Sequence, residues 1–202
     1  MLKITHLSHA GFAIENDKEK LIIDPADASF GYEFKDEVAN YLLVSHDHWD
    51  HNNISGIAVE ENVGSFRITK IDSFHDKTNG SERGENIIHI IETDGIRICH
   101  LGDLGHVLTE DQIKQIGRVD ILIIPTGGVF TIDSKEAIEV IGQLNNPETI
   151  IPMHYKTEKW GEDKGIDSVD KFIEKIKGYK IEKPDSNVLD YEKPSEKTVY
   201  II

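Results

Sequence analysis

The stretch His46-Asp47-His48-Trp49-Asp50-His51 places three imidazoles and two carboxylates within six residues. It directly follows the apolar run 40–44, which is typical of a buried strand. Residues two apart in an extended segment project to the same side, so His46 and His48 could bind one metal ion together. If the chain then turns, Asp50 and His51 diverge toward a second ion. The pattern indicates a metal site at a strand end rather than a cluster of solvated turn residues.

Further segments outside this motif predict strands. Asp94-Gly95 is a favoured two-residue hairpin turn between the strand-like segments 87–93 and 96–100. Alternating or continuous apolar runs predict additional strands at residues 2–6, 11–15, 20–24, 65–73, 119–124, 149–151 and 197–202.

Helix signals begin later in the chain. Residues 109–112 (Thr-Glu-Asp-Gln) form a capping box, and apolar spacing predicts helices at 133–144 and 168–176. The polar, proline-bearing segment 182–195 has no clear pattern. Early hairpins followed by strand–helix alternation suggest layered α and β structure with a mixed sheet.

Composition limits the class of protein. A chain of 202 residues fits one domain, residues 1–202, and 38% hydrophobic with 29% charged residues is typical of a soluble globular protein. The net charge of −15 disfavours nucleic-acid and anionic-membrane partners. The single cysteine, Cys99, cannot form an intrachain disulfide, and residues 1–14 do not resemble a signal peptide. We therefore expect a cytoplasmic protein without a membrane partner.

Five more motifs accompany the histidine-rich stretch, in a consistent order along nearly the whole chain. With that stretch, they make the sequence resemble the metallo-β-lactamase superfamily, and in particular its short metal-dependent hydrolases related to the ascorbate-phosphate lactonase. The motifs are Ser8-His9-Ala10-Gly11-Phe12, Ile23-Asp24-Pro25, Phe74-His75-Asp76, His100-Leu101-Gly102-Asp103 and Ile151-Pro152-Met153-His154-Tyr155.

The resemblance implies a fold and a set of metal ligands. The fold is an α/β (α+β) four-layered αββα sandwich with the site at one edge of two sheets. Asp24 is implied as a hydrogen-bond partner of a ligand, and His9 and His100 as neighbours of the cleft. The implied ligands are His46, His48 and His75 for one ion, Asp50, His51 and His154 for the other, and Asp103 as a bridge between them.

The ligand set leads to an expected mechanism. Two divalent ions lower the pKa of a shared water, which supplies a hydroxide nucleophile, and one ion polarises the scissile bond. Asp50 is expected to orient the nucleophile, and His154 or Tyr155 to assist as a donor. Zinc is the leading candidate, with manganese or iron as alternatives, because nitrogen and oxygen ligands accept all three.

Function is expected to be hydrolysis of a small-molecule ester, lactone or phosphoester. A nuclease is the main alternative, disfavoured by the net charge of −15. A redox di-iron protein would need a glutamate in the signature and a flavin partner domain, and neither is seen. A noncatalytic metal-stabilised binding protein is the remaining class. The sequence does not indicate an oligomeric state.

Other residues receive simpler interpretations. His89 and His6 lie in strand-like segments and are expected on a sheet surface, and Cys99 in the core. His106 is either a substrate contact or a loop histidine. The segments 78–85 and 127–132 are candidates for loops that contact substrate.

Overall fold

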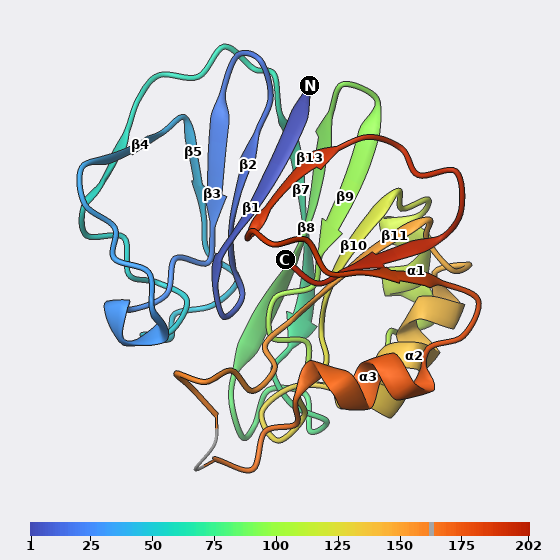
Figure 1. Cartoon of the computed structure of the whole chain (residues 1–202). Helices are drawn as coiled ribbons and strands as arrows, with labels where there is room; N and C mark the ends of the chain where they lie inside the picture. The colour runs from blue at the N-terminus through green and yellow to red at the C-terminus, as the bar shows by residue number, and fades with distance from the viewer. Residues whose placement is uncertain (162–163) are drawn as a thin grey trace.

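The computed structural model describes residues 1–161 and 164–202, whose strands form two large sheets packed face to face (Figure 1). The first sheet is antiparallel except for its β3–β5 pair, which is parallel. Its five strands, in spatial order, are β13 (Val188–Tyr191), β1 (Leu2–Ser8), β2 (Gly11–Glu15), β3 (Lys20–Ile23) and β5 (Tyr41–Leu43).

The second sheet is mixed. Its strands from β9 to β12 pair in parallel, and the hairpin of β7 and β8 adds an antiparallel edge. The seven strands, in spatial order, are β12 (Lys180–Glu182), β14 (Thr198–Tyr200), β11 (Thr149–Met153), β10 (Ile121–Pro125), β9 (Ile96–His100), β8 (Glu85–Thr93) and β7 (Arg67–Phe74).

Strand β10 shows why the seven-stranded sheet is buried on both faces. Successive side chains of a strand point to opposite sides, so Ile121 and Ile123 pack between the sheets while Leu122 and Ile124 pack toward the helices. The helices that cover this outer face are α1 (Glu110–Ile116), α2 (Ser134–Gln143) and α3 (Val169–Lys175) (Figure 1).

A ribbon and a short 3-10 turn accompany the outer face of the five-stranded sheet. In the ribbon, β4 (Glu37–Ala39) pairs in parallel with β6 (Ile57–Val59), and η1 (Ala28–Phe30) lies nearby in the chain. Ala39 packs with Ala13 and Ile22 in a small hydrophobic cluster there. The predicted α/β class and the layered metallo-β-lactamase type are confirmed, with this face covered by ribbon and loops in the described part of the chain.

Local sequence signals account for several boundaries. The side chains of Thr109 and Gln112 form the predicted capping box of α1. Asp94 and Gly95 take positive φ values of 50° and 77° between β8 and β9, as a type I′ hairpin requires. Strand β13 lies inside segment 182–195, for which the sequence predicted no element. The strand has four residues, and its pairing with β1 is a contact that no local pattern reveals.

The interpretation of His89 as a sheet-surface residue is wrong. It lies on β8 with 0% of its side chain exposed, because β8 runs inside a sheet that is covered on both faces. Neither ring nitrogen has a hydrogen-bond partner among the described residues. His6 is half-buried, and its ring nitrogens lie 2.8 Å from Ile202 O and 3.0 Å from His9 O. Cys99 is buried in the core, as expected.

His89 should make the protein sensitive to acid. Burial lowers the pKa of His89 to about 4, so between the unfolded value of 6.5 and this value protons bind the unfolded chain preferentially. Its contribution to stability is complete above pH 6.5 and is lost as the pH falls through 4. Between pH 7.5 and 4.5 the unfolding free energy of His89→Leu should therefore fall by about 2.5 kcal/mol less than that of wild type.

Urea unfolding of chelator-treated protein at the two pH values measures this difference. At pH 7.5 the imidazole is neutral in both states, so the comparison there reports packing alone. Parallel stability–pH curves for the two proteins would show that His89 does not carry the effect.

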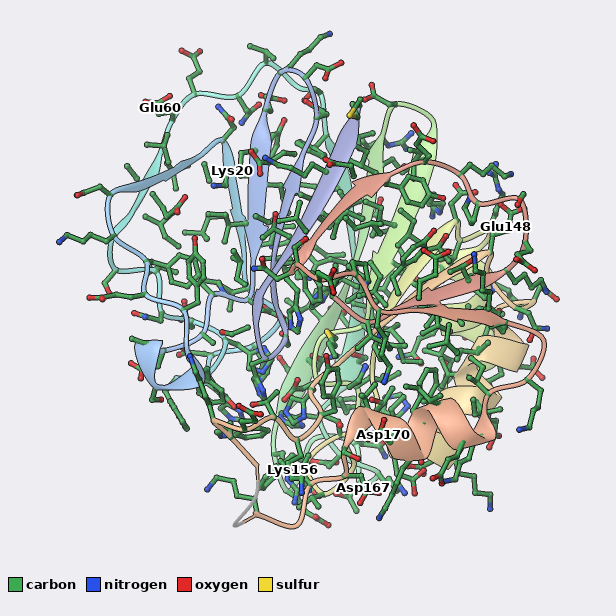
Figure 2. All side chains as sticks on the ribbon, in the orientation of Figure 1. Lys20, Glu60, Glu148, Lys156, Asp167 and Asp170 are labelled. Atoms are coloured by element: carbon green, nitrogen blue, oxygen red, sulfur yellow. The ribbon has the colours of Figure 1, made fainter. Side chains whose placement is uncertain are left out.

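Charged side chains project from the periphery, as Glu60 and Asp170 show (Figure 2). None of the helices in the described residues is long and apolar enough to cross a membrane.

Candidate metal centre

Strand ends bring the predicted ligands together at one edge of the two sheets. In the first sheet β1, β3 and β5 run in the same direction, and in the second sheet β7, β9 and β11 do. The residues that follow these strands therefore meet at a common edge. They include His9 after β1, Asp24 after β3, the stretch 46–51 after β5, His75 after β7, Asp103 after β9 and His154 after β11.

One ligand group consists of His46, His48 and His75. Each offers a ring nitrogen, and these atoms all lie within 4.8 Å of one another. The Nδ1 atom of His46 lies 2.9 Å from Ser45 Oγ, while its Nε2 atom is buried without a hydrogen-bond partner in the described residues. This arrangement leaves Nε2 available to a cation.

A second group consists of Asp50, His51 and His154, together with His9. Their ligand atoms also lie within 4.8 Å of one another, and His9 Nε2 is 3.6 Å from Asp50 Oδ2. The resemblance placed His9 near the cleft, and the structure brings it into this group. Burial, and next the neighbouring His154, lower the pKa of His9 to about 3, so its imidazole is neutral at pH 7.

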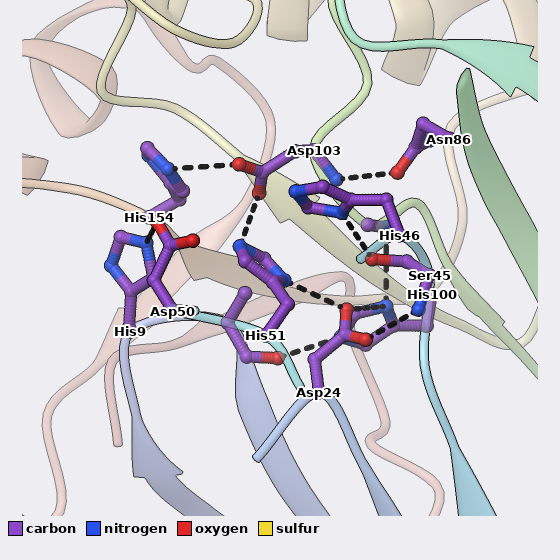
Figure 3. Close-up of polar contacts among 12 residues, drawn as sticks. His9, Asp24, Ser45, His46, Asp50, His51, Asn86, His100, Asp103 and His154 are labelled. Carbon is purple, nitrogen blue, oxygen red and sulfur yellow. Dashed lines mark hydrogen bonds and ion pairs between the residues drawn. The ribbon is translucent and has the colours of Figure 1, made fainter. Parts of the chain in front are cut away.

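Asp103 joins the two groups. Figure 3 shows its contacts with His51 and His154 of the second group. Its Oδ1 atom lies 3.2 Å from His51 Nε2, and its Oδ2 atom lies 3.1 Å from His75 Nε2 and 3.2 Å from His154 Nε2. Burial would raise the pKa of Asp103, but the charges and hydrogen bonds of His154 and His51 hold it well below its usual value. The buried carboxylate is therefore ionised among three imidazoles.

Asp24 supports the second group from behind (Figure 3). Its Oδ2 atom lies 3.2 Å from His51 Nδ1, and its Oδ1 atom accepts a 2.6 Å hydrogen bond from the backbone N–H of Ser45. Burial would raise the pKa of Asp24, but mainly the charge of His51 lowers it to about 2. Burial lowers the pKa of His51, yet Asp103 and Asp24 raise it well above 6.5. In the metal-free protein His51 is thus protonated, and ligation requires loss of that proton.

Two more buried residues fix the surroundings. His100 Nε2 donates to Ala10 O at 2.9 Å while Nδ1 accepts from Gly102 N at 3.1 Å, which defines its tautomer. Asn86 Oδ1 accepts from the backbone N–H of Asp103 at 2.9 Å. Both interactions hold the loop that carries Asp103.

Backbone conformation at the site is unusual. His9, Asp24 and His154 have φ values of 56°, 48° and 50°, in the left-handed region that non-glycine residues rarely adopt. Such positions cost about 1–3 kcal/mol each and cluster at functional sites. At this edge they turn three side chains inward at the ends of three strands.

The donor set fits a divalent cation. Buried ring nitrogens without a hydrogen-bond partner among the described residues include His46 Nε2, His75 Nδ1 and His154 Nδ1. Unsatisfied buried polar atoms are rare in folded proteins, so a cluster of them indicates a ligand. Burial, and next His51, lower the pKa of His46 to about 3, which keeps it neutral as ligation requires.

The structure bears on two residues whose roles the sequence left open, His106 and Tyr155. His106 accepts from Phe74 N at 3.3 Å, and its Nδ1 donates to Val107 O at 2.8 Å, so it acts as a loop histidine. Tyr155 lines a cavity of about 350 Å³ that shares Trp160 with a second cleft. Most of the proposed ligands line that second cleft: His48, Asp50, His75, Asp103 and His154. Of the two predicted donors, His154 lines the cleft and Tyr155 does not.

The cleft above the ligands has a volume of about 310 Å³. Arg83 and Phe130, from the two loops predicted to contact substrate, contribute to its wall. Trp160 and Lys164 also line it, although no sequence motif around them predicts this. Trp49, from the histidine-rich stretch, is 61% exposed at the cleft.

Comparisons with known proteins identify the family of this chain. Residues 3–154 match the family model described as a β-lactamase superfamily domain. A metal-dependent hydrolase of Archaeoglobus fulgidus is 28% identical over 197 residues, covering 77% of this chain and 84% of that protein. Another, of Pyrococcus abyssi, is 30% identical, covering 78% and 86%.

A solved structure from Thermotoga maritima is described as a proposed zinc-dependent hydrolase of the metallo-β-lactamase superfamily. It has a TM-score of 0.79 and 36% identity, covering 100% of this chain and 98% of its own. The resemblance inferred from the motifs is thereby confirmed. The chain belongs to the metallo-β-lactamase superfamily, among its short metal-dependent hydrolases.

Proposed function

We propose that this hydrolase cleaves a small ester, lactone or phosphoester with two divalent cations, zinc being the leading candidate. The observation that carries the proposal is Asp103, whose two carboxylate oxygens contact imidazoles of both ligand groups. A carboxylate in this position can serve two ions at once.

Seven residues would hold the ions. When bound, the ions supply Lewis acidity and lower the pKa of water toward neutrality. The first ion would be held by His46, His48 and His75, the second by Asp50, His51 and His154, and Asp103 would serve both.

Asp50 also has a role toward the attacking water. Burial would raise the pKa of Asp50, but a hydrogen bond from His9 contributes most to lowering it, to about 2. The ionised carboxylate lines the cleft and can accept a hydrogen bond from water there, which orients the oxygen for attack. His154 also lines the cleft, and because it would hold an ion as a neutral imidazole, we assign it to the metal and not to proton donation.

The cleft favours a small molecule over a polymer. A volume of about 310 Å³ lies at the lower end for small-molecule sites. Phe130 and Trp160 supply apolar walls against which the nonpolar part of a small substrate can pack. The net charge of −15 opposes a nucleic-acid substrate. The single buried Cys99 fits a reducing, cytoplasmic location.

Elemental analysis of tag-free protein, paired with a substrate panel, tests the proposal. The panel contains lactones, phosphodiesters and structured RNA, each assayed with zinc, manganese or iron restored. We expect about two ions per chain and turnover of one small-substrate class. His48→Ala should bind less metal and show no turnover. Cleavage of RNA alone would favour the nuclease, and protein that takes up no ion and stays inactive would favour a binding protein.

A further inference from the structure

The cleft contains two cationic side chains besides the proposed ligands. Arg83 lies in the loop between β7 and β8, and Lys164 lies in the segment that precedes α3, yet both line the same cavity. Cationic residues are outnumbered in this chain, 22 against 37 acidic ones. Two of them at the one cleft that holds the ligand groups therefore call for a physical explanation.

Asp76 fixes the loop that carries Arg83. Its buried carboxylate accepts hydrogen bonds from the backbone N–H groups of Thr78, Gly80, Glu82 and Arg83 at 2.8 to 3.0 Å. These charge-assisted bonds hold the loop in one conformation. Because Asp76 directly follows the proposed ligand His75, these bonds fix the position of the Arg83 backbone relative to the metal centre.

The protein contacts of the Arg83 guanidinium position it but leave N–H donors free. Its Cζ atom lies over the ring of Phe130, 5.5 Å from the centroid, and this contact holds the guanidinium at the cleft wall. Among the described residues, its carboxylate neighbour is Glu82, 3.8 Å away, and the Arg83 side chain is 34% exposed. A guanidinium has five N–H donors, so donors remain for a ligand.

Arg83 also stands where two cavities meet. A neighbouring cavity of about 320 Å³ shares His75, Arg83 and Phe130 with the cleft. A substrate that is cleaved at the metal centre can therefore extend its uncleaved part past Arg83 toward the neighbouring cavity.

We propose that Arg83, assisted by Lys164, binds an anionic group, a carboxylate or a phosphate, on the part of the substrate remote from the scissile bond. This inference rests on the proposed hydrolase function. A planar guanidinium fork matches two oxygens of either anion, and the nearby lysine adds a second positive charge. Arg83 is then a specificity residue, and the substrate class narrows to anionic esters, lactones or phosphoesters.

Binding of matched hydroxamic acids to the zinc-loaded full-length protein tests this proposal without turnover. Butanohydroxamic acid has a methyl tail, succinic monohydroxamic acid replaces that methyl with a carboxylate, and 3-phosphonopropanohydroxamic acid with a phosphonate. Calorimetry should show an anionic tail binding about tenfold more tightly than the methyl tail, as one charge-assisted pair predicts. Each series is repeated with one added methylene to vary the reach.

Variants assign the preference to a residue. Arg83→Gln should abolish the preference while the methyl-tailed compound keeps its affinity within about twofold, and Arg83→Lys should keep part of it. Lys77→Gln is the matched control. Lys77 is 65% exposed and pairs with Glu136, and it lines the neighbouring cavity but not the cleft. It removes the same charge nearby and should keep the full preference.

The outcomes separate this inference from the function on which it rests. A preference for either anionic tail that depends on Arg83 supports it, and the better tail identifies the anion. Equal binding of all tails by wild type, or a preference that survives in Arg83→Gln, overturns it while the metal centre stands. Failure of every hydroxamate to bind overturns the proposed metal centre, and this inference with it.

Discussion

Asp103→Asn should lower kcat/KM of the metal-loaded enzyme by about a thousandfold and remove at least one bound ion. The substitution keeps the size of the side chain but removes the charge that contacts imidazoles of both ligand groups. Lewis-acid stabilisation is worth several kcal/mol in the transition state, and each 1.36 kcal/mol is a factor of ten in rate. Elemental analysis and steady-state kinetics measure the two effects on the same preparation.

Asp72→Asn is the matched control for this variant. Asp72 lies on β7 with its side chain exposed, so the same chemical change there removes no ligand. It should keep wild-type metal content and turnover. If Asp103→Asn also kept both, the bridging assignment would be wrong, whereas loss of metal with a near-native circular dichroism spectrum supports it.

Asp24→Asn should weaken metal binding about 10- to 100-fold, although Asp24 is not itself a proposed ligand. The carboxylate lies 3.2 Å from His51 Nδ1 and thereby directs His51 Nε2 toward the ligand group. Partners of this kind fix the orientation of a metal-binding imidazole and raise its basicity, and their loss costs affinity of that order. Competition with a chromophoric chelator measures the change, and Asp190→Asn, an exposed carboxylate on β13, is the control.

The same variant has a pH signature in the metal-free protein. The pKa of Asp24 is lowered to about 2 in the folded state, so its contribution to stability is complete above 3.8 and is lost as the pH falls through 2. The pKa of His51 is raised, so its contribution is complete below 6.5 and is lost as the pH rises through the folded value. Asp24→Asn should therefore destabilise more at pH 5.5 than at high pH, and a pH-independent loss would contradict the pairing.

Sequence patterns predicted the candidate ligands because metal binding demands particular residue types at strand ends. His46 and His48 stand two apart after an apolar strand, and the structure places their ring nitrogens in one group with His75. The partner His75 is 27 residues or more away, so only the family resemblance, and no local spacing, linked it to them. The assignment of these residues as ligands stays a prediction until metal is measured.

Other features depended on tertiary contacts and left no local signal. His89 looked like a surface residue because alternation cannot distinguish a half-covered strand from one covered on both faces. Trp160 reaches the cleft from a loop without a motif, and its position follows from packing against His9 and Phe30. Arg83 lay in a segment marked as a candidate loop, but its direction depends on the hydrogen bond from its backbone to Asp76.

The pairing of β1 with β13 affects how the chain is made as well as how it is held. On the ribosome β1 emerges before β13, and the edge that β13 covers stays open until residues 188–191 are synthesised. At about 5–20 residues per second this interval lasts roughly 10 to 40 seconds. An unpaired strand edge is a template for association with other chains. The nascent polypeptide, rather than the finished enzyme, is therefore the form most exposed to aggregation, and its yield in cells depends on protection of that edge during translation.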